Sequence, residues 1–395
     1  MATDVAIGGA RKVSLLSSVR AGALFWGAVA AIVFAAYYIG LKQFHPTLWP
    51  GSYEYSQVAR SIASGRGIVT GSGSVLEYWF LHSAGLPLPY FYHDIGNSLL
   101  MALFFKILGA REQVIGLMSG AFLILTAPLT FLFGSRLYGR KVAAVATALV
   151  VVNAELLIYA TTGHSEVPFA FFLTLFLFLL YRFRSGWGLF AAGLVFGWLI
   201  VLRSNALPFL PWVLLFILFD PSEASGAAFG IREKWVELRQ EWRSRAARLA
   251  LFLVGMLVLF VPNAVRNYVY MHSPLYNVNS VYSLVWYTSA ISGKSQEIFS
   301  QPGLNVDPLR FIATHPAELV NKMQYQLSRT ADHLLTGVIY PDNWQDAFII
   351  LLFVLSLIAP YKGESQRQQV FRWLVVILIL TALIVGSVLN IRWRH

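Results

Sequence analysis

Long apolar stretches separated by short polar segments, many of them basic, dominate the hydropathy pattern of this chain. A helix needs about 20 apolar residues to cross the hydrocarbon core of a bilayer. The first such stretch follows three basic residues, is too long for the core of a signal peptide and ends without a cleavage site of small residues, so we expect it to be retained as a span. Nine spans are predicted, at residues 21–41, 113–135, 142–160, 166–181, 187–202, 205–219, 249–265, 345–360 and 371–390.

A shorter apolar stretch at residues 95–109 carries Lys106 and fits either a span or a helix lying flat at the membrane surface. Lys and Arg collect in cytoplasmic loops, which decides between these two interpretations. If this stretch does not span, the most basic loops all fall on the same side as the N-terminus. If it spans, those loops lie outside. We therefore predict an interfacial helix.

The predicted fold class is an all-α polytopic membrane protein with about nine transmembrane helices and a single transmembrane domain over residues 1–395. With the N-terminus inside, two large segments lie outside, at residues 43–111 and 266–344. The first of them holds the interfacial helices. The loop at 220–248 lies in the cytoplasm and contains an amphipathic helix, which we expect to rest on the inner leaflet.

Composition supports a membrane protein and excludes several other classes. Hydrophobic residues make up 57% of the chain and charged residues 12%, against about 25% charged in soluble domains. Too little polar surface remains for a soluble enzyme, a disordered chain or a coiled coil. Cysteine is absent, which excludes disulfides, thiolate metal sites and cysteine nucleophiles. The net charge is +11, and the basic residues lie beside apolar runs rather than in one patch. Anionic lipid is therefore the expected partner rather than nucleic acid.

Two glutamates stand at the outer ends of predicted spans, where a charged group is costly and often functional. Apolar residues from Tyr55 to Ile62 recur at helical spacing and place Glu54 in the first turn of an interfacial helix. Glu166 follows Ser165, which can cap the next helix. Each carboxylate also has a simpler interpretation, because an acidic side chain near a helix N-terminus is stabilised by the helix dipole.

Other ionisable residues on the outer side add candidates for binding and catalysis. The adjacent His93 and Asp94 fit an acid–base or metal role, or are neighbours by chance. Arginine matches the geometry of a phosphate group, although an arginine at a span end also serves as a membrane anchor. The arginines that face the same side as the two glutamates are Arg203, Arg266, Arg392 and Arg394.

These residues resemble the C-type (GT-C) superfamily of membrane glycosyltransferases. The likeness is greatest to the branch with the dolichyl-phosphate-mannose protein mannosyltransferases and the bacterial aminoarabinose transferase. Six short segments carry it, in the order and topology of the superfamily. They begin with Ser-Tyr-Glu-Tyr at residue 52, and they occupy residues 52–67, 95–109, 136–141, 163–166, 193–203 and 262–268.

The resemblance implies a multi-pass protein of the bacterial inner membrane that acts on the periplasmic face. The donor would be a sugar on a polyprenyl phosphate, and the acceptor hydroxyl would belong to a glycan, a lipid or a protein. Glu54 is the first choice for the general base and Glu166 the second, with inversion at the sugar. Arginines would stabilise the departing phosphate. The remaining expected substrate-binding residues are Tyr55, His93, Asp94 and Lys106. No cofactor is required, although some superfamily members hold a divalent cation, so metal use stays open.

This chain departs from the superfamily pattern at three places. One is the second carboxylate, which is often Asp in the family and is Glu166 here. The first-loop acid is usually an Asp a few residues before the tyrosine, where Gly51 stands here, so Glu54, Glu77 or Asp94 is expected to supply the carboxylate. The family's Arg-aromatic-Arg stretch is followed by further spans, which predicts a compact or C-terminally truncated member. The alternative functions are a lipid-linked sugar transporter, or a non-catalytic relative that binds lipid.

Overall fold

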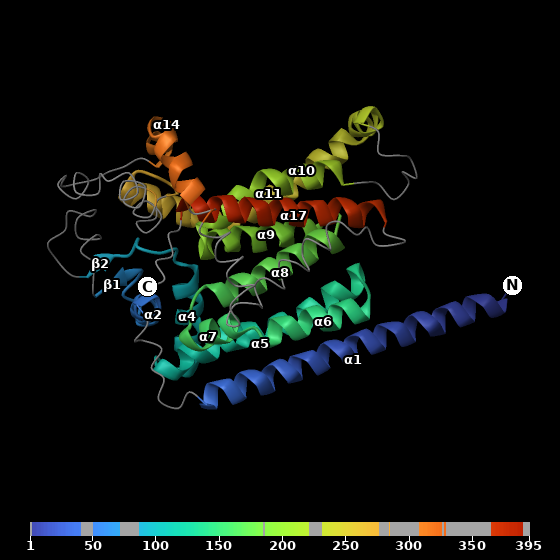
Figure 1. Ribbon diagram of the computed structural model, residues 1–395, viewed down its shortest axis with the longest axis horizontal. Helices are drawn as coiled ribbons and strands as arrows, with labels where there is room; N and C mark the ends of the chain where they lie inside the picture. The colour runs from blue at the N-terminus through green and yellow to red at the C-terminus, as the bar shows by residue number, and fades with distance from the viewer. Residues whose placement is uncertain are drawn as a thin grey trace.

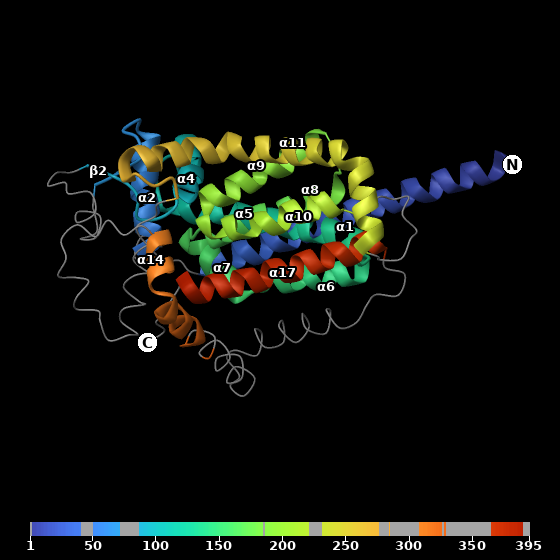
Figure 2. The ribbon, with the colours of Figure 1, turned by 90° about the horizontal axis from the view of Figure 1, so that it is seen from above.

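The computed structural model describes residues 2–40, 50–71, 87–184, 186–220, 231–275, 308–325 and 365–389, together with residues 284 and 328. Long helices lie side by side in a bundle, with the N-terminus at one end (Figures 1 and 2). In chain order the elements are α1 (Ala2–Gly40), α2 (Pro50–Ala63), β1 (Val69–Thr70), β2 (Leu88–Pro89), α4 (Gly96–Leu108), α5 (Glu112–Leu137), α6 (Arg140–Val151), α7 (Ala154–Thr162), α8 (Glu166–Arg182), α9 (Trp187–Leu202), η2 (Ser204–Phe209), α10 (Leu210–Phe219), α11 (Ile231–Met271), α14 (Pro308–Thr314) and α17 (Gln366–Leu389).

The predicted spans coincide with helices throughout the described residues, and the prediction at 345–360 lies outside them. By length and composition, three described helical segments can cross a membrane: Ser18–Gly40, Glu112–Leu137 and Glu241–Met271. The bent pair α6 and α7 makes a fourth if it counts as one span. The protein is therefore an α-helical membrane protein, and the total of nine spans stays a prediction.

Two predicted boundaries differ from the structure for local reasons. The expected span at 142–160 is broken into α6 and α7, which meet at an angle of 52°. Asn153 causes the break, because its backbone is extended and its Oδ1 accepts a hydrogen bond from the Leu156 amide at 2.8 Å, as an N-cap does. The expected amphipathic helix of loop 220–248 is not separate, since α11 continues from Ile231 through the following apolar stretch.

Close helix packing builds the core between α8, α9, α10, α11 and α17. Aromatic side chains such as Phe176, Phe196 and Phe252 fill it. Glycines bring α9 against α11, because a Cβ on Gly193 would lie 2.0 Å from the Phe252 carbonyl oxygen. Small residues serve the same purpose in other membrane bundles, where they let helix backbones approach closely. A second cluster joins α1, α2, α4, α5, α7 and α8.

The outer helices expose apolar side chains along their length. On α11, Val254, Val258 and Val261 are among those exposed, and α1 exposes Leu24 and Ile32. Such continuous apolar surface would favour aggregation in water and is expected where helices face lipid. Most of the span in α5 is buried in the bundle instead, whereas those in α1 and α11 are largely exposed.

Short elements gather across the end of the bundle that is opposite the N-terminus. Helices α2 and α4 run crosswise to the long helices there, and β1 pairs antiparallel with β2 through Val69 opposite Pro89 (Figures 1 and 2). A helix that lies crosswise at a bundle end is the arrangement expected of an interfacial helix. The location of α2 and α4 at the membrane surface stays a prediction.

Candidate functional site

Six of the predicted site residues meet at this end of the bundle. Helix α2 supplies Glu54 and Tyr55, the segment before α4 supplies His93 and Asp94, α8 begins with Glu166, and Arg203 follows α9. We call these six residues the candidate site: Glu54, Tyr55, His93, Asp94, Glu166 and Arg203.

Two glycines let these segments approach one another. Gly163 ends α7 in the left-handed conformation, with φ of 73°, and a Cβ there would also lie 2.2 Å from Ile115. The Asn97 side chain donates to the Gly163 carbonyl at 2.9 Å, which ties α4 to this turn. A Cβ on Gly96 would lie 2.5 Å from the Cα of Leu202, so a larger residue would push α4 away from the end of α9.

Glu166 forms an ion pair with Arg203. The Oε1 of Glu166 lies 2.7 Å from Nη1 of Arg203, and about a quarter of each side chain is exposed. The Arg203 guanidinium also lies over the Phe169 ring, 5.9 Å from its centroid. The prediction that α8 begins at Glu166 is confirmed, but Ser165 makes no side-chain capping bond to the helix. The ion pair with Arg203, rather than the helix end alone, holds this carboxylate.

Glu54 pairs with His93 across the α2–α4 interface. The Oε2 of Glu54 lies 3.1 Å from Nε2 of His93, whose ring packs against Tyr55 with 5.1 Å between ring centroids. The prediction that Glu54 lies in the first turn of its helix is wrong, because α2 begins at Pro50 and has no acidic residue in its first turn. The helix dipole falls off within that turn, so it does not explain this glutamate.

Tyr55 lies between the two ion pairs. Its side chain is buried, and it lies near Ser165 and in the electrostatic field of Glu166, Arg203 and Asp94. Burial raises the pKa of the Tyr55 hydroxyl above its ordinary value. The hydroxyl therefore remains protonated at neutral pH and is a hydrogen-bond donor at the centre of the site.

Each glutamate has one buried oxygen without a donor among the described residues. These atoms are Oε2 of Glu54 and Oε2 of Glu166. The contact of Glu54 with His93 is close but lacks hydrogen-bond geometry. A buried carboxylate oxygen that accepts no hydrogen bond is costly, so it marks a position where a ligand hydroxyl or a water molecule would bind favourably.

Asp94 holds the backbone next to Arg203. Its Oδ2 accepts hydrogen bonds from the Ser204 amide at 2.8 Å and from the Ser204 hydroxyl at 3.0 Å. His93 instead faces Glu54, so the two neighbours do not act as one pair. The expected acid–base or metal role of His93 and Asp94 stays a prediction. Asp94 positions the turn that presents the arginine.

A histidine without an assigned role from the sequence lies beside the site. Nδ1 of His164 is 2.7 Å from the Thr162 hydroxyl and 3.3 Å from the Ser52 hydroxyl. Both hydroxyls donate to backbone carbonyls, so Nδ1 carries the proton of the neutral ring. Burial lowers the pKa of His164. The polar run from Thr161 to Glu166 between two apolar helices was the available signal.

Gly51 faces the same histidine. A Cβ on Gly51 would lie 3.4 Å from Nε2 of His164 and 3.9 Å from the Tyr55 ring. The position where the resemblance expects an acid is therefore next to the candidate site, and Glu54 lies less than one helical turn further along α2.

The other predicted binding residues have different locations. Arg266 donates to the Tyr90 carbonyl and lies 4.1 Å from the centroid of the Phe91 ring, which ties α11 to the segment leading to His93. Lys106 is exposed in the last turn of α4, more than two turns from the end nearest the site. Glu77, Arg392 and Arg394 lie outside the described residues.

Within the described ranges, no group of three or more His, Cys, Asp or Glu side chains has the arrangement of a metal site. The candidate site offers carboxylates, an imidazole, a phenol and a guanidinium. This set can accept a proton from a hydroxyl and bind an anionic phosphate group.

Comparison with known proteins gives a family match and one match to a solved structure. Residues 93–230 match the family model described as dolichyl-phosphate-mannose-protein mannosyltransferase. This match confirms the resemblance to the GT-C superfamily. The crystal structure of ArnT from Cupriavidus metallidurans bound to undecaprenyl phosphate aligns at 14% identity and a TM-score of 0.44, over 92% of this chain and 77% of that chain. No curated protein matches.

Proposed function

We propose, because residues 93–230 match the model of a GT-C glycosyltransferase family, that this protein is a sugar transferase. It would transfer a sugar from a polyprenyl phosphate to an acceptor hydroxyl. The bond between the sugar C1 and the phosphate oxygen breaks, and a bond from C1 to the acceptor oxygen forms. The proton of the acceptor goes to a carboxylate. Polyprenyl phosphate leaves as an anion.

The observation that carries the proposal is the pair of buried carboxylate oxygens, on Glu54 and Glu166, with the Arg203 guanidinium bound to Glu166. A transferase of this kind needs a proton acceptor for the hydroxyl and a cation for the leaving phosphate. Both groups lie at one end of the bundle, where crosswise helices cover it.

Glu54 is the better candidate for the general base. Its partner is His93, which is charged only when protonated, whereas Glu166 is bound to a permanently charged arginine. An adjacent guanidinium stabilises the ionised carboxylate and so weakens it as a proton acceptor. Glu166 would orient Arg203 and the acceptor, and Glu54 would remove the proton.

Arg203 is the arginine of the candidate site. It contacts Glu166 through Nη1, and a guanidinium has five N–H donors, so further donors of the fork suit a phosphate oxygen. A phosphate leaving group is stable as an anion at neutral pH and needs cations rather than a general acid. Arg266 positions the segment that carries His93.

A single displacement without a covalent enzyme intermediate would invert the configuration at C1 of the sugar. Basic loops at the opposite end of the bundle favour a periplasmic location for the candidate site. The acceptor hydroxyl would belong to a glycan, a lipid or a protein. The transfer requires no cofactor; if a divalent cation takes part, Glu54 and Glu166 would hold it and it would act as a Lewis acid.

Separate Glu54→Gln and Glu166→Gln variants test the proposal. Each removes a charge while keeping the shape of the side chain. The matched control is Glu155→Gln, which changes an exposed glutamate in the first turn of α7. Membranes containing each variant would receive undecaprenyl phosphate donors that carry a hexose, a pentose or aminoarabinose, and mass spectrometry would measure the undecaprenyl phosphate released.

We expect Glu54→Gln to lower release by about 10²- to 10⁴-fold, because a general base typically contributes that much. Glu166→Gln would reduce release less, and Glu155→Gln would leave it unchanged. Full release by both site variants would refute the roles of these carboxylates. Donor lipid that moves across the membrane without release of undecaprenyl phosphate, in the parent protein as well, would support a transporter.

A further inference from the structure

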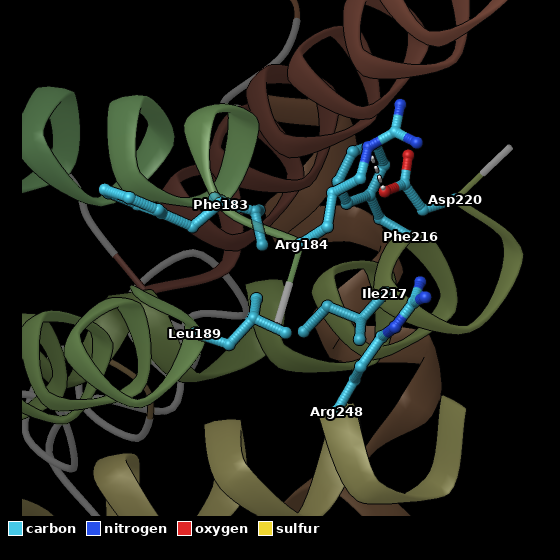
Figure 3. A pocket seen from close by; sticks show the side chains of 8 residues that line it. Phe183, Arg184, Leu189, Phe216, Ile217, Asp220 and Arg248 are labelled. Carbon is cyan, nitrogen blue, oxygen red and sulfur yellow. Dashed lines mark ion pairs between the residues drawn. The ribbon is translucent and has the colours of Figure 1, made fainter. Parts of the chain in front are cut away.

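A second charged cluster lies at the opposite end of the bundle from the candidate site. It adjoins a recess between the ends of α8, α9 and α10 and the side of α11. Arg184 and Asp220 lie together at this recess, Arg248 lies apart from them, and apolar side chains, including Phe183 and Leu189, line the rest (Figure 3). The recess has about 200 Å³ of space, part of it open to solvent.

Two guanidinium groups contact the carboxylate of Asp220. Its Oδ1 lies 3.0 Å from Nε of Arg367, and its Oδ2 lies 3.7 Å from Nε of Arg184. Arg248 on α11 lines the same recess. Among the described residues of this cluster, one negative charge thus meets three positive charges. Placing several positive charges together in a partly buried site is costly unless anions compensate for their charge.

Two of these arginines also have a donor without an acceptor. Nε of Arg248 and Nη2 of Arg367 are buried and lack a hydrogen-bond partner among the described residues. The guanidinium of Arg367 is fixed from its other side, since it lies 5.2 Å from the centroid of the Tyr181 ring. The Arg367 guanidinium is therefore held in place between Asp220 and Tyr181.

The neighbouring Arg245 shows what a purely structural arginine looks like at this end. It is almost fully buried, donates to the Leu218 carbonyl and binds Glu241 through Nε at 3.2 Å and Nη2 at 3.1 Å. Its donors are used within the protein. Arg248, one helical turn away on α11, has a buried donor that is not.

We propose that this cluster binds the phosphate headgroup of an anionic phospholipid in the leaflet at this end of the bundle. Arginine recognises phosphate through paired N–H donors. The apolar side of the recess suits the first acyl carbons of a lipid, which a free phosphate ion lacks. The indole of Trp187 beside it is 84% exposed, as is typical of aromatic residues at a membrane interface.

The recess is narrow, so the phosphate would bind at its mouth, beside Arg184 and Arg248, which line it, and near Arg367, which binds Asp220. The bound headgroup would bridge α11 to α17 and would balance the excess positive charge around Asp220. This site differs from the donor site proposed above, because it lies at the other end of the bundle. Its carboxylate, Asp220, is already bound by Arg184 and Arg367.

Native mass spectrometry of the detergent-purified protein tests this binding site. The probes are palmitoyl-oleoyl phosphatidylglycerol, the zwitterionic palmitoyl-oleoyl phosphatidylcholine and inorganic phosphate. The main variant is Arg248→Gln, which leaves the Asp220–Arg367 pair intact, and Arg367→Gln is the second. The matched control is Lys141→Gln, an exposed basic residue near the N-terminus of α6 at the same end.

We expect phosphatidylglycerol to bind and phosphatidylcholine to bind more weakly. Arg248→Gln should raise the dissociation constant for phosphatidylglycerol about five- to tenfold, the contribution of one basic group at a phosphate. Lys141→Gln should leave it unchanged. Thermal unfolding in lipid-free detergent would confirm that the variants fold like the parent.

Three results would overturn the proposal. One is equal weakening by all three substitutions, which would mean a diffuse electrostatic attraction. The second is equal binding of both lipids. The third is saturation by inorganic phosphate at the concentration of lipid used, in which case the ligand is a soluble anion.

Discussion

At the scale of single residues, the candidate site depends on what each ionisable group contacts. Glu54 and Glu166 are both glutamates at one end of the bundle, yet one faces an imidazole and the other a guanidinium. An imidazole is charged only when protonated, whereas a guanidinium is always charged. Tyr55 stays protonated between them. Two glutamates that look alike in the sequence therefore have partners of different chemistry.

His164 makes the stability of the protein depend on pH. Burial lowers the pKa of the folded imidazole below its ordinary 6.5. As the pH falls through about 6.5, the unfolded chain takes up a proton that the folded chain does not, so the free energy of unfolding decreases. Above that pH, the contribution of His164 to the free energy of unfolding is fully retained. We expect the melting temperature in detergent to fall between pH 8 and pH 5, and less so for His164→Asn.

The control for this experiment is His272→Asn. His272 is exposed and has a φ of 54°, a left-handed conformation that Asn tolerates well. This variant should keep the pH dependence of the parent. The burial of His164 would be irrelevant to acid stability if His164→Asn and His272→Asn gave the same profile as the parent.

At the scale of elements, backbone contacts between helices fix the geometry of the site. Gly193, Gly197 and Gly255 lie where α9 and α11 touch, and each would place a Cβ within 2.3 Å of a backbone atom of the other helix. Gly96 similarly lets α4 reach the end of α9. The ends of these helices carry Arg203 and Arg266. Helix spacing therefore controls where the cations lie.

Gly193→Ala tests the close contact between α9 and α11. The new methyl group would overlap the Phe252 carbonyl, and such overpacking costs about 1–3 kcal/mol. We expect a lower melting temperature in detergent and lower transferase activity. Gly40→Ala is the control, because nothing lies within 4 Å of a Cβ at the end of α1. A Gly193→Ala protein as stable as Gly40→Ala would mean that the helices separate without cost.

At the scale of the whole molecule, the two ends of the bundle carry different chemistry. One end has the acidic residues and crosswise helices of the candidate site (Figure 2). The other has the basic cluster around Asp220 and the loops rich in arginine. Lys and Arg accumulate on the cytoplasmic side of membrane proteins. The asymmetry predicts which end of the bundle faces the periplasm.

Single cysteines test this orientation cleanly, because the chain contains none. Ser64→Cys places a thiol at the exposed end of α2, and Lys141→Cys places one at the opposite end of the bundle. In intact cells with a permeable outer membrane, a membrane-impermeant maleimide should label Ser64→Cys and not Lys141→Cys. After the inner membrane is opened, both should react. The reverse pattern before opening would place the candidate site in the cytoplasm.

The sequence by itself predicted where most of the described helices lie and which loops carry the basic residues. Both properties are local, because apolar length and basic flanks are read from contiguous residues. It also supplied the superfamily resemblance. It missed the break at Asn153 and placed Glu54 in the wrong turn, because one capping hydrogen bond and the start of α2 are set by details that hydropathy averages out.

Tertiary structure alone decided the partners. His93 and Asp94 are adjacent in the chain, yet one contacts Glu54 on α2 and the other contacts Ser204 after α9. His164 gained its neighbours only because α2 packs against the turn before α8. These pairings join segments up to 112 residues apart, so no local pattern encodes them. The packing of helices through glycines brings them together, and that is why the site exists only in the folded bundle.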